Sequence, residues 1–144
     1  MKTELTFWMN RRVDGLRIAV INFMFENAKL RDEPHSNKTG IPKDDYDSLI
    51  HIYTKDQNET YVTLKSWRKL MDDHSNRTKS DPKLTLTEAY TTHDLTIKYY
   101  NADSNVPFNF KFINQLHNKS KAVDYKTLID KWMKTERQRS ELGC

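Results

Sequence analysis

The protein has 144 residues, a mass of 17.2 kDa and a formal net charge of +4, which together fit one soluble domain. Its mean hydropathy is −0.89, and no apolar run reaches the roughly 18–20 residues of a membrane span. Three glycines and one cysteine, Cys144, exclude a glycine-rich phosphate loop, a Gly-x-Ser-x-Gly elbow and an internal disulfide. We therefore expect a single domain, residues 1–144, in the cytoplasm.

Residues 5–30 carry apolar side chains every three or four positions, beginning with Leu5, Met9 and Val13. This spacing predicts an amphipathic helix. A hairpin that turns at residues 13–15 is the competing interpretation, because residues 16–25 are rich in β-formers. The sequence favours the helix and leaves the hairpin open.

Residues 31–47 contain two prolines, Gly40 and many charges, which is typical of a long loop. Residues 49–53 and 60–62 are predicted to be strands joined by a turn. A short helix follows, with Thr63 as its N-cap and residues 64, 67, 70 and 71 on its apolar face.

Three further strands are predicted at residues 84–90, 95–100 and 108–113, since the first two alternate between apolar and polar side chains. Their short connections indicate antiparallel neighbours. Asp124 is predicted to cap a last helix, and residues 140–144 a frayed tail. The expected fold class is therefore α+β. It has an antiparallel sheet of about five strands, with N-terminal, middle and C-terminal helices on one face or at the ends.

The positive charge is concentrated in the last third of the chain. Residues 97–144 hold 9 basic and 5 acidic side chains, whereas the first two thirds are balanced. Such an asymmetry is typical of a surface that faces a polyanion, although a solvated helix face is the simpler explanation. The predicted partner-binding residues are Lys111, Lys119, Lys121, Lys126, Lys131, Lys134, Arg137 and Arg139.

Two catalytic alternatives rest on side chains near the ends of predicted elements. His74, His93 and His117 lie at such ends, where a pair of imidazoles would act as acid and base in a phosphodiesterase. Asp72, Asp73 and His74 are an alternative metal-binding set. Solvated turn residues explain the same pattern, so the favoured interpretation has no catalytic residue, no metal and no cofactor.

Phe108, Phe110 and Phe112 alternate with Asn109 and Lys111. On a strand the three rings share one face. That face is either the core of the sheet or an exposed platform for unpaired bases, and the burial preference of phenylalanine favours the core.

These observations favour a small non-enzymatic regulatory protein that engages nucleic acid, or an acidic host protein that handles it, through its basic C-terminal surface. In composition the chain resembles small bacteriophage accessory proteins that inhibit or modulate a host machine, which would place it in the host cytosol. The alternatives are the phosphodiesterase or nuclease, and a structural or assembly subunit that docks through residues 7–9.

Overall fold

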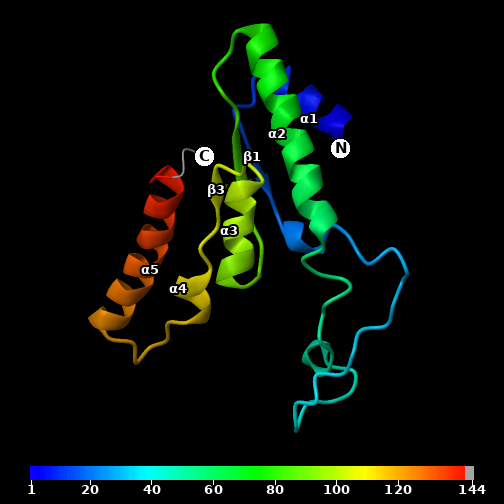
Figure 1. Ribbon diagram of the computed structural model, residues 1–144, viewed down its shortest axis with the longest axis vertical. Coiled ribbons are helices and arrows are strands. Elements are labelled where there is room, and N and C mark those ends of the chain that lie inside the picture. Colours follow the sequence, from blue (N-terminus) through cyan, green and yellow to red (C-terminus); the bar gives the residue numbers. More distant parts are fainter. Residues whose placement is uncertain (142–144) are drawn as a thin grey trace.

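The computed structural model describes the backbone of residues 1–141 and the side chains of residues 1–134. Strands and helices alternate along most of this length (Figure 1). The strands are β1 (Gly15–Ile18), β2 (Leu84–Thr87) and β3 (Val106–Pro107). The α-helices are α1 (Lys2–Met9), α2 (Asn58–Thr78), α3 (His93–Asn101), α4 (Lys111–Asn114) and α5 (Ala122–Glu141).

The sheet has three strands in the order β1-β2-β3, and both neighbouring pairs are parallel. Ile18 lies opposite Thr87 across β1 and β2, and Pro107 lies opposite Thr87 on the other side. Each strand is reached through a helix, as parallel pairing requires. The predicted antiparallel sheet of five strands is therefore wrong, and the described residues form an alternating β/α unit.

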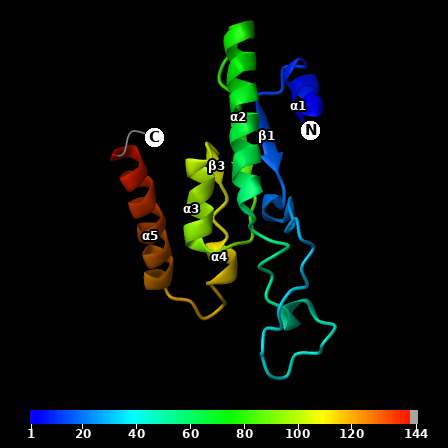
Figure 2. The same ribbon diagram turned by 45° about the vertical axis from the view of Figure 1, so that its right-hand side comes forward.

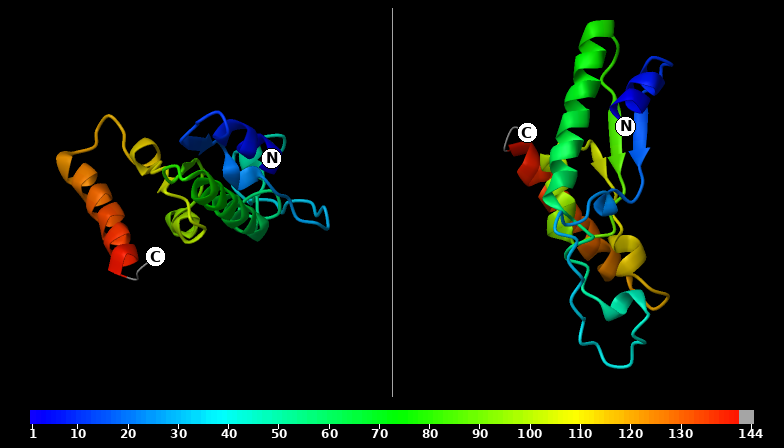
Figure 3. Two further views of the ribbon diagram at one scale, coloured as in Figure 1. Left: turned by 90° about the horizontal axis from the view of Figure 1, so that it is seen from above. Right: turned by 90° about the vertical axis from the view of Figure 1, so that its right-hand side faces the viewer.

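One face of the sheet is covered and the other is open. Thr85 and Thr87 are fully buried toward α2 and α3, which lie together along one side of the strands (Figure 3). The opposite face carries Leu84 and Val106, whose side chains remain 49% and 46% exposed. The core therefore lies on the helical side, where α1 and α2 pack together. Its buried apolar residues include Leu5, Met9, Ile18, Ile21, Leu64, Trp67, Met71, Ala89, Tyr99 and Ala102.

Residues 5–30 form neither of the two predicted structures. The first helix ends at Met9, and Arg12 adopts a left-handed backbone with φ 65° before the chain enters β1. The hairpin interpretation correctly places a strand in this region. However, β1 pairs with β2, about 70 residues further along the chain, and the two strands run parallel. A local pattern of β-formers cannot identify such a distant partner.

Two predicted strands, residues 60–62 and 95–100, lie in helices, because the side chains that are buried there recur every three or four positions and not every two. Residues 60–62 belong to α2, which buries Thr60, Leu64, Trp67 and Met71 along one side. In α3, Thr96, Tyr99 and Tyr100 are buried at helical spacing, and the Thr92 hydroxyl accepts the Leu95 N–H at 3.4 Å as an N-cap.

A long excursion, residues 24–57, leaves the carboxyl end of the sheet and returns to the start of α2 (Figures 1 and 2). It contains the predicted loop 31–47. The predicted strand 49–53 is reduced to one isolated bridge between His35 and Leu49. Glu33 holds the excursion together, because its carboxylate accepts the N–H groups of Ile52, Tyr53 and Thr54 at 2.7–2.9 Å.

The pentapeptide 108–112 is not a strand either. β3 ends at Pro107 and α4 begins at Lys111, so the three phenylalanines do not share one face. Phe108 and Phe110 are half-buried, and Phe112 is 37% exposed. The last predicted helix is present, but it begins at Ala122, before the predicted cap. Asp124 lies in its first turn, where its carboxylate accepts the N–H of Lys121 at 2.7 Å, and the helix runs to Glu141. The tail predicted at 140–144 falls partly on residues 142–144, which lie outside the described residues.

Within the described residues, no helix combines the length and the apolar character that crossing a bilayer requires.

Candidate active site at the carboxyl edge of the sheet

The carboxyl ends of the three parallel strands meet at one edge of the sheet. The residues that directly follow β1, β2 and β3 are Ala19, Glu88 and Phe108. The ladder continues one step beyond the strands, because the Glu88 N–H donates to the Ile18 carbonyl at 2.9 Å. Ala19 and Glu88 are therefore neighbours across this edge. In open parallel β/α folds this edge is the usual position of a ligand site.

Glu88 is a buried carboxylate, with 6% of the residue exposed. The Arg17 guanidinium of β1 donates to the Glu88 carboxylate across the open face of the sheet. Arg17 also lies 5.5 Å from the centre of the Phe108 ring. A buried carboxylate is costly unless it is paired, so Arg17 both stabilises Glu88 and fixes its direction.

The chain segments beyond Glu88 form a hydrogen-bonded rim. The Ile21 N–H donates to the Glu88 carbonyl at 3.0 Å, and the Asn22 amide donates to the Tyr90 carbonyl at 3.4 Å. Asn22 is fully buried. These contacts join the segment after β1 to the segment after β2. Both the N–H and the carbonyl of Glu88 are hydrogen-bonded to residues 18–21.

A second acidic group lies on this rim. The Thr91 hydroxyl donates to Asp56 Oδ2 at 2.8 Å, and the Asp56 N–H donates to the Asn22 carbonyl at 2.8 Å. Burial raises the pKa of the Asp56 carboxyl, and the Thr91 hydrogen bond and the charges of Lys55 and Lys98 only partly oppose this. Asp56 therefore keeps its proton to a higher pH than an ordinary aspartate does.

Aromatic rings border the same edge. Tyr90 stacks on Phe110 with ring centres 4.2 Å apart, and Phe110 contacts Phe108 at 6.0 Å. Tyr90 remains 45% exposed. The pentapeptide singled out in the sequence thus supplies rings next to the carboxylate, from a turn and not from a strand.

The structure does not bring the three predicted histidines together in one cavity. His74 ends α2 at the amino edge of the sheet and contacts Asn10 Oδ1 at 3.0 Å, whereas His93 begins α3 at the carboxyl edge. His117 lies in the loop before α5. Each of the three lines a different cavity, and His74 lies at the opposite edge of the sheet from His93.

The alternative metal-binding set is also separated by its ion pairs. Asp72 pairs with Arg68 at 2.6 Å, and Asp73 pairs with Lys69 at 3.1 Å. Among the side chains that the structure describes, no group of three acidic, histidine or cysteine residues is placed to hold a metal ion.

The predicted basic surface is divided between several environments. Lys126 pairs with Asp130 on α5, whereas Lys111 and Lys131 line a cavity together with His93. Lys119, Lys121 and Lys134 are exposed. The side chains of Arg137 and Arg139 lie outside the described residues. A partner at this surface and a cytoplasmic location both stay predictions.

Comparison with known proteins gives the chain a family. Residues 1–142 match the family described as "Alpha amylase, catalytic domain". The chain is 42% identical over 139 residues to an alpha-glucosidase of Culex pipiens, covering 92% of this chain and 23% of that protein. It is 37% identical over 134 residues to an alpha-glucosidase of Apis mellifera, covering 92% of this chain and 22% of that protein.

A solved structure has the same arrangement of elements. The alpha-glucosyl transfer enzyme XgtA superposes with a TM-score of 0.70 at 24% sequence identity, covering 93% of this chain and 25% of that one. This likeness shows the fold. All three comparisons cover nearly the whole chain, and the chain spans about a quarter of the length of the curated relatives it matches.

A parallel β/α sheet with a buried carboxylate at its carboxyl edge is the arrangement that catalytic β/α-barrel domains repeat around their barrel. The chain belongs to the alpha-amylase catalytic domain family, which is a family of glycoside hydrolases. The predicted regulatory protein that engages nucleic acid is therefore wrong, as is the resemblance to phage accessory proteins. The family match over residues 1–142 overturns both.

Glu88 and Arg17 are not among the site residues predicted from the sequence. Residues 84–90 were correctly predicted to hold a strand, and a glutamate directly after the pattern Leu-Thr-Leu-Thr was the available signal. That signal has meaning only in a parallel sheet, where strand ends collect at one edge. In the predicted antiparallel sheet, the carboxyl ends of neighbouring strands lie at opposite edges, so the position of Glu88 does not indicate a site.

Proposed function

We propose that the protein acts on α-glucosidic bonds, with Glu88 as a catalytic carboxylate at the carboxyl edge of the sheet. The observation that carries this proposal is the position of Glu88: buried, directly after β2, and oriented by Arg17 from the neighbouring strand. Barrel enzymes place their catalytic groups at the ends of their strands. The family membership and the names of the relatives support the choice of an α-glucoside as substrate.

Glycoside hydrolysis ordinarily uses two carboxyl groups, one on each side of the bond to be cleaved. The strand end beside Glu88 carries Ala19, so β1 and β2 do not provide this pair. The proposal therefore requires the second carboxyl group from another element. Asp56, whose pKa burial raises, is one described group at the same rim.

The test is the turnover of maltose and of p-nitrophenyl α-glucoside by the purified protein and by its Glu88→Gln variant. The amide of glutamine can still accept a hydrogen bond from Arg17, but it cannot carry a proton or a negative charge. We expect kcat to fall by about 10²–10⁴-fold, the usual loss when a general acid or base is removed.

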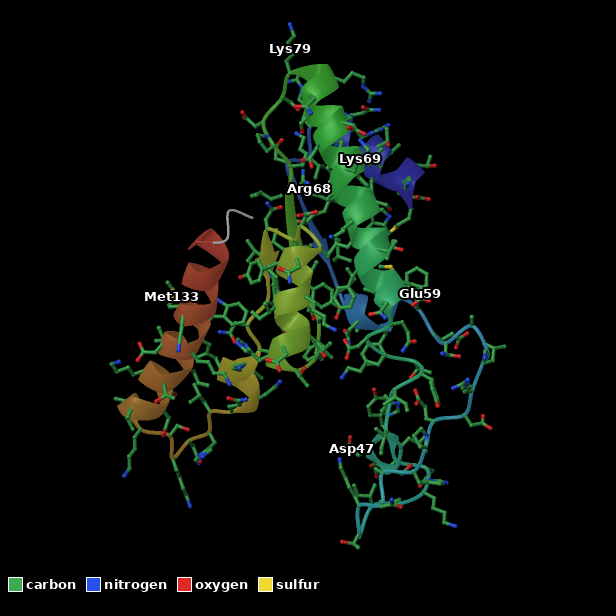
Figure 4. All side chains as sticks on the ribbon, viewed as in Figure 1. Asp47, Glu59, Arg68, Lys69, Lys79 and Met133 are labelled. Carbon is green, nitrogen blue, oxygen red and sulfur yellow. The ribbon has the colours of Figure 1, made fainter. Side chains whose placement is uncertain are left out.

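The matched control is Glu59→Gln, the same chemical change at an exposed position in the first turn of α2 (Figure 4). It should leave kcat unchanged. Absence of turnover in the unmodified protein, or equal activity of the two variants, would overturn the proposal.

A further inference from the structure

Four asparagines begin the pattern Asn-x-Ser/Thr, with x other than proline, which is the acceptor pattern for N-linked glycosylation. The chain has 11 asparagines, and 22 of its 144 residues are serine or threonine, so about one or two such patterns arise by chance. The proposed hydrolysis makes no use of them. The four asparagines are Asn37, Asn58, Asn76 and Asn118.

The structure leaves the side chains of these four asparagines unbonded. All four are exposed, and among the described residues none of their amide groups takes part in a hydrogen bond. Five of the other seven asparagines, by contrast, use their amides to stabilise the fold, namely Asn10, Asn22, Asn27, Asn105 and Asn109. The acceptor nitrogens are therefore free of a structural role and open to solvent.

The hydroxyl residue of the pattern separates one asparagine from the other three. Thr60, which completes the pattern of Asn58, is fully buried. The hydroxyl residues of the remaining patterns stay at least partly exposed, namely Thr39, Thr78 and Ser120. Since the hydroxyl residue is part of the recognised pattern, the folded chain presents three complete acceptor sites and conceals part of the fourth.

The three presented sites lie on different parts of the molecule. Asn37 belongs to the excursion, where its backbone is left-handed with φ 53°. Asn76 lies in the last turn of α2, and Asn118 lies in the loop between α4 and α5. None of the three lines the two cavities that border the carboxyl edge of the sheet. A bulky group on an exposed, unbonded side chain displaces no packed residue.

We propose that Asn37, Asn76 and Asn118 each carry an N-linked oligosaccharide. In this modification the asparagine amide nitrogen forms a bond to the first sugar carbon of a lipid-linked oligosaccharide diphosphate. The bond between that carbon and the diphosphate breaks, the nitrogen releases one proton, and the lipid diphosphate leaves. The transfer takes place in the lumen of the secretory pathway, so this proposal and the predicted cytoplasmic location exclude each other.

The test uses the protein isolated from its natural source. Peptide N-glycosidase in water enriched in the heavy isotope of oxygen converts each glycosylated asparagine to a labelled aspartate, which mass spectrometry of the peptides locates. We expect the label at residues 37, 76 and 118. Asn114 is the internal control, because it is exposed but begins no acceptor pattern, and it should stay unlabelled. Absence of the label from any of the three positions would overturn the assignment there, and its absence from all three would overturn the proposal.

Variants of the full chain distinguish the acceptor pattern from an exposed asparagine alone. The chain is directed into the secretory pathway of cultured eukaryotic cells by an added, cleavable signal peptide, and its mobility on a denaturing gel is compared before and after glycosidase treatment. Thr39→Ala should remove the oligosaccharide at Asn37 without changing that side chain, whereas Thr39→Ser should keep it. Because Thr39 is exposed, both variants should fold alike.

Asn114→Gln is the matched control in this second experiment and should leave the mobility unchanged. Equal mobility of Thr39→Ala and Thr39→Ser would overturn the assignment of Asn37. Neither experiment measures glucosidase activity, so failure of this proposal and failure of the proposed hydrolysis are separate outcomes.

Discussion

Arg17 of β1 donates to the carboxylate of Glu88 one position beyond β2, so a single ion pair joins the two parallel strands at the edge where the candidate site lies. Arg17 has a side chain that is 61% exposed, whereas that of Glu88 is 8% exposed. The exposed guanidinium therefore reaches the buried carboxylate from the open face of the sheet and compensates its charge.

Replacing Arg17 by methionine should lower the free energy of unfolding by about 1–3 kcal/mol, because Glu88 would be left buried without its partner. Solvent around the exposed guanidinium keeps the loss below that of a fully buried pair. Urea unfolding followed by circular dichroism measures it. Arg77→Met, at an exposed position in the last turn of α2, is the control and should change stability by less than about 0.5 kcal/mol. Equal losses in both variants would refute the role of Arg17.

Arg68 and Lys69 are adjacent on α2 and allow a direct comparison of a buried and an exposed cation (Figure 4). Arg68 is buried and donates to the Lys83 carbonyl at 2.5 Å, to Asp72 at 2.6 Å and to Asn105 Oδ1 at 3.2 Å. Asn105 Oδ1 in turn accepts the Thr85 N–H at 2.8 Å. Arg68 therefore joins α2 to both β2 and the start of β3.

We expect Arg68→Met to lower the free energy of unfolding by about 2–4 kcal/mol, because it leaves the Lys83 carbonyl without this donor and removes the contacts with Asp72 and Asn105. Lys69→Met removes only the exposed pair with Asp73 and should cost about 0.3–0.5 kcal/mol. Thermal and urea unfolding of the two variants give the difference directly. A difference close to zero would mean that Arg68 does not connect helix and sheet.

The excursion should open in acid because of Glu33. Burial raises the pKa of this carboxyl, but the hydrogen bonds from Thr54, Tyr53 and Ile52 outweigh burial and hold it below its ordinary value of 4.5. A lowered pKa means that the stabilising contribution is present above pH 4.5 and is lost as the pH falls further. Amide exchange at residues 52–54 should accelerate in that range beyond the intrinsic pH trend. Glu33→Gln should weaken the protection already at neutral pH, whereas Glu59→Gln should not.

His93, Lys111 and Lys131 line one cavity, and the two lysine charges lower the pKa of His93, so their titrations should be coupled. Removing the charge of Lys111 in Lys111→Gln should raise the pKa of His93 toward its ordinary value of 6.5, because one of the charges that oppose protonation is gone. The remaining burial and Lys131 keep it somewhat below that value. An NMR pH titration of the His93 ring measures the change. The same titration in Lys134→Gln should give the unmodified curve, and an unchanged His93 in Lys111→Gln would contradict the arrangement of the cavity.

The molecule is extended, with Lys79 at the end of α2 and Asp47 in the excursion at opposite ends (Figure 4). Helix α5 lies to one side of the sheet, and its exposed apolar side chains include Val123, Ile129 and Met133. In a closed β/α-barrel, the inner face of the sheet and the sides of the helices pack against neighbouring elements.

The sequence alone determined several features, and all of them are local. Charge counts located the basic excess in residues 97–144, and the prolines and charges of residues 31–47 predicted an irregular segment. Asp124 predicted the presence of the last helix, although not its first residue. Capping and turn preferences act between residues a few positions apart, so they can be recognised without the fold.

The tertiary structure decided the strand directions and, with them, the site. Gly15 pairs with Leu84 and Leu86 with Val106, contacts that no local periodicity specifies. In α3, helical burial of Tyr99 and Tyr100 overrode an alternating pattern, because packing against the core outweighs propensity. Only parallel pairing brings Glu88 to the same edge as Arg17, Asp56 and Tyr90, since parallel strands alone place all their carboxyl ends together.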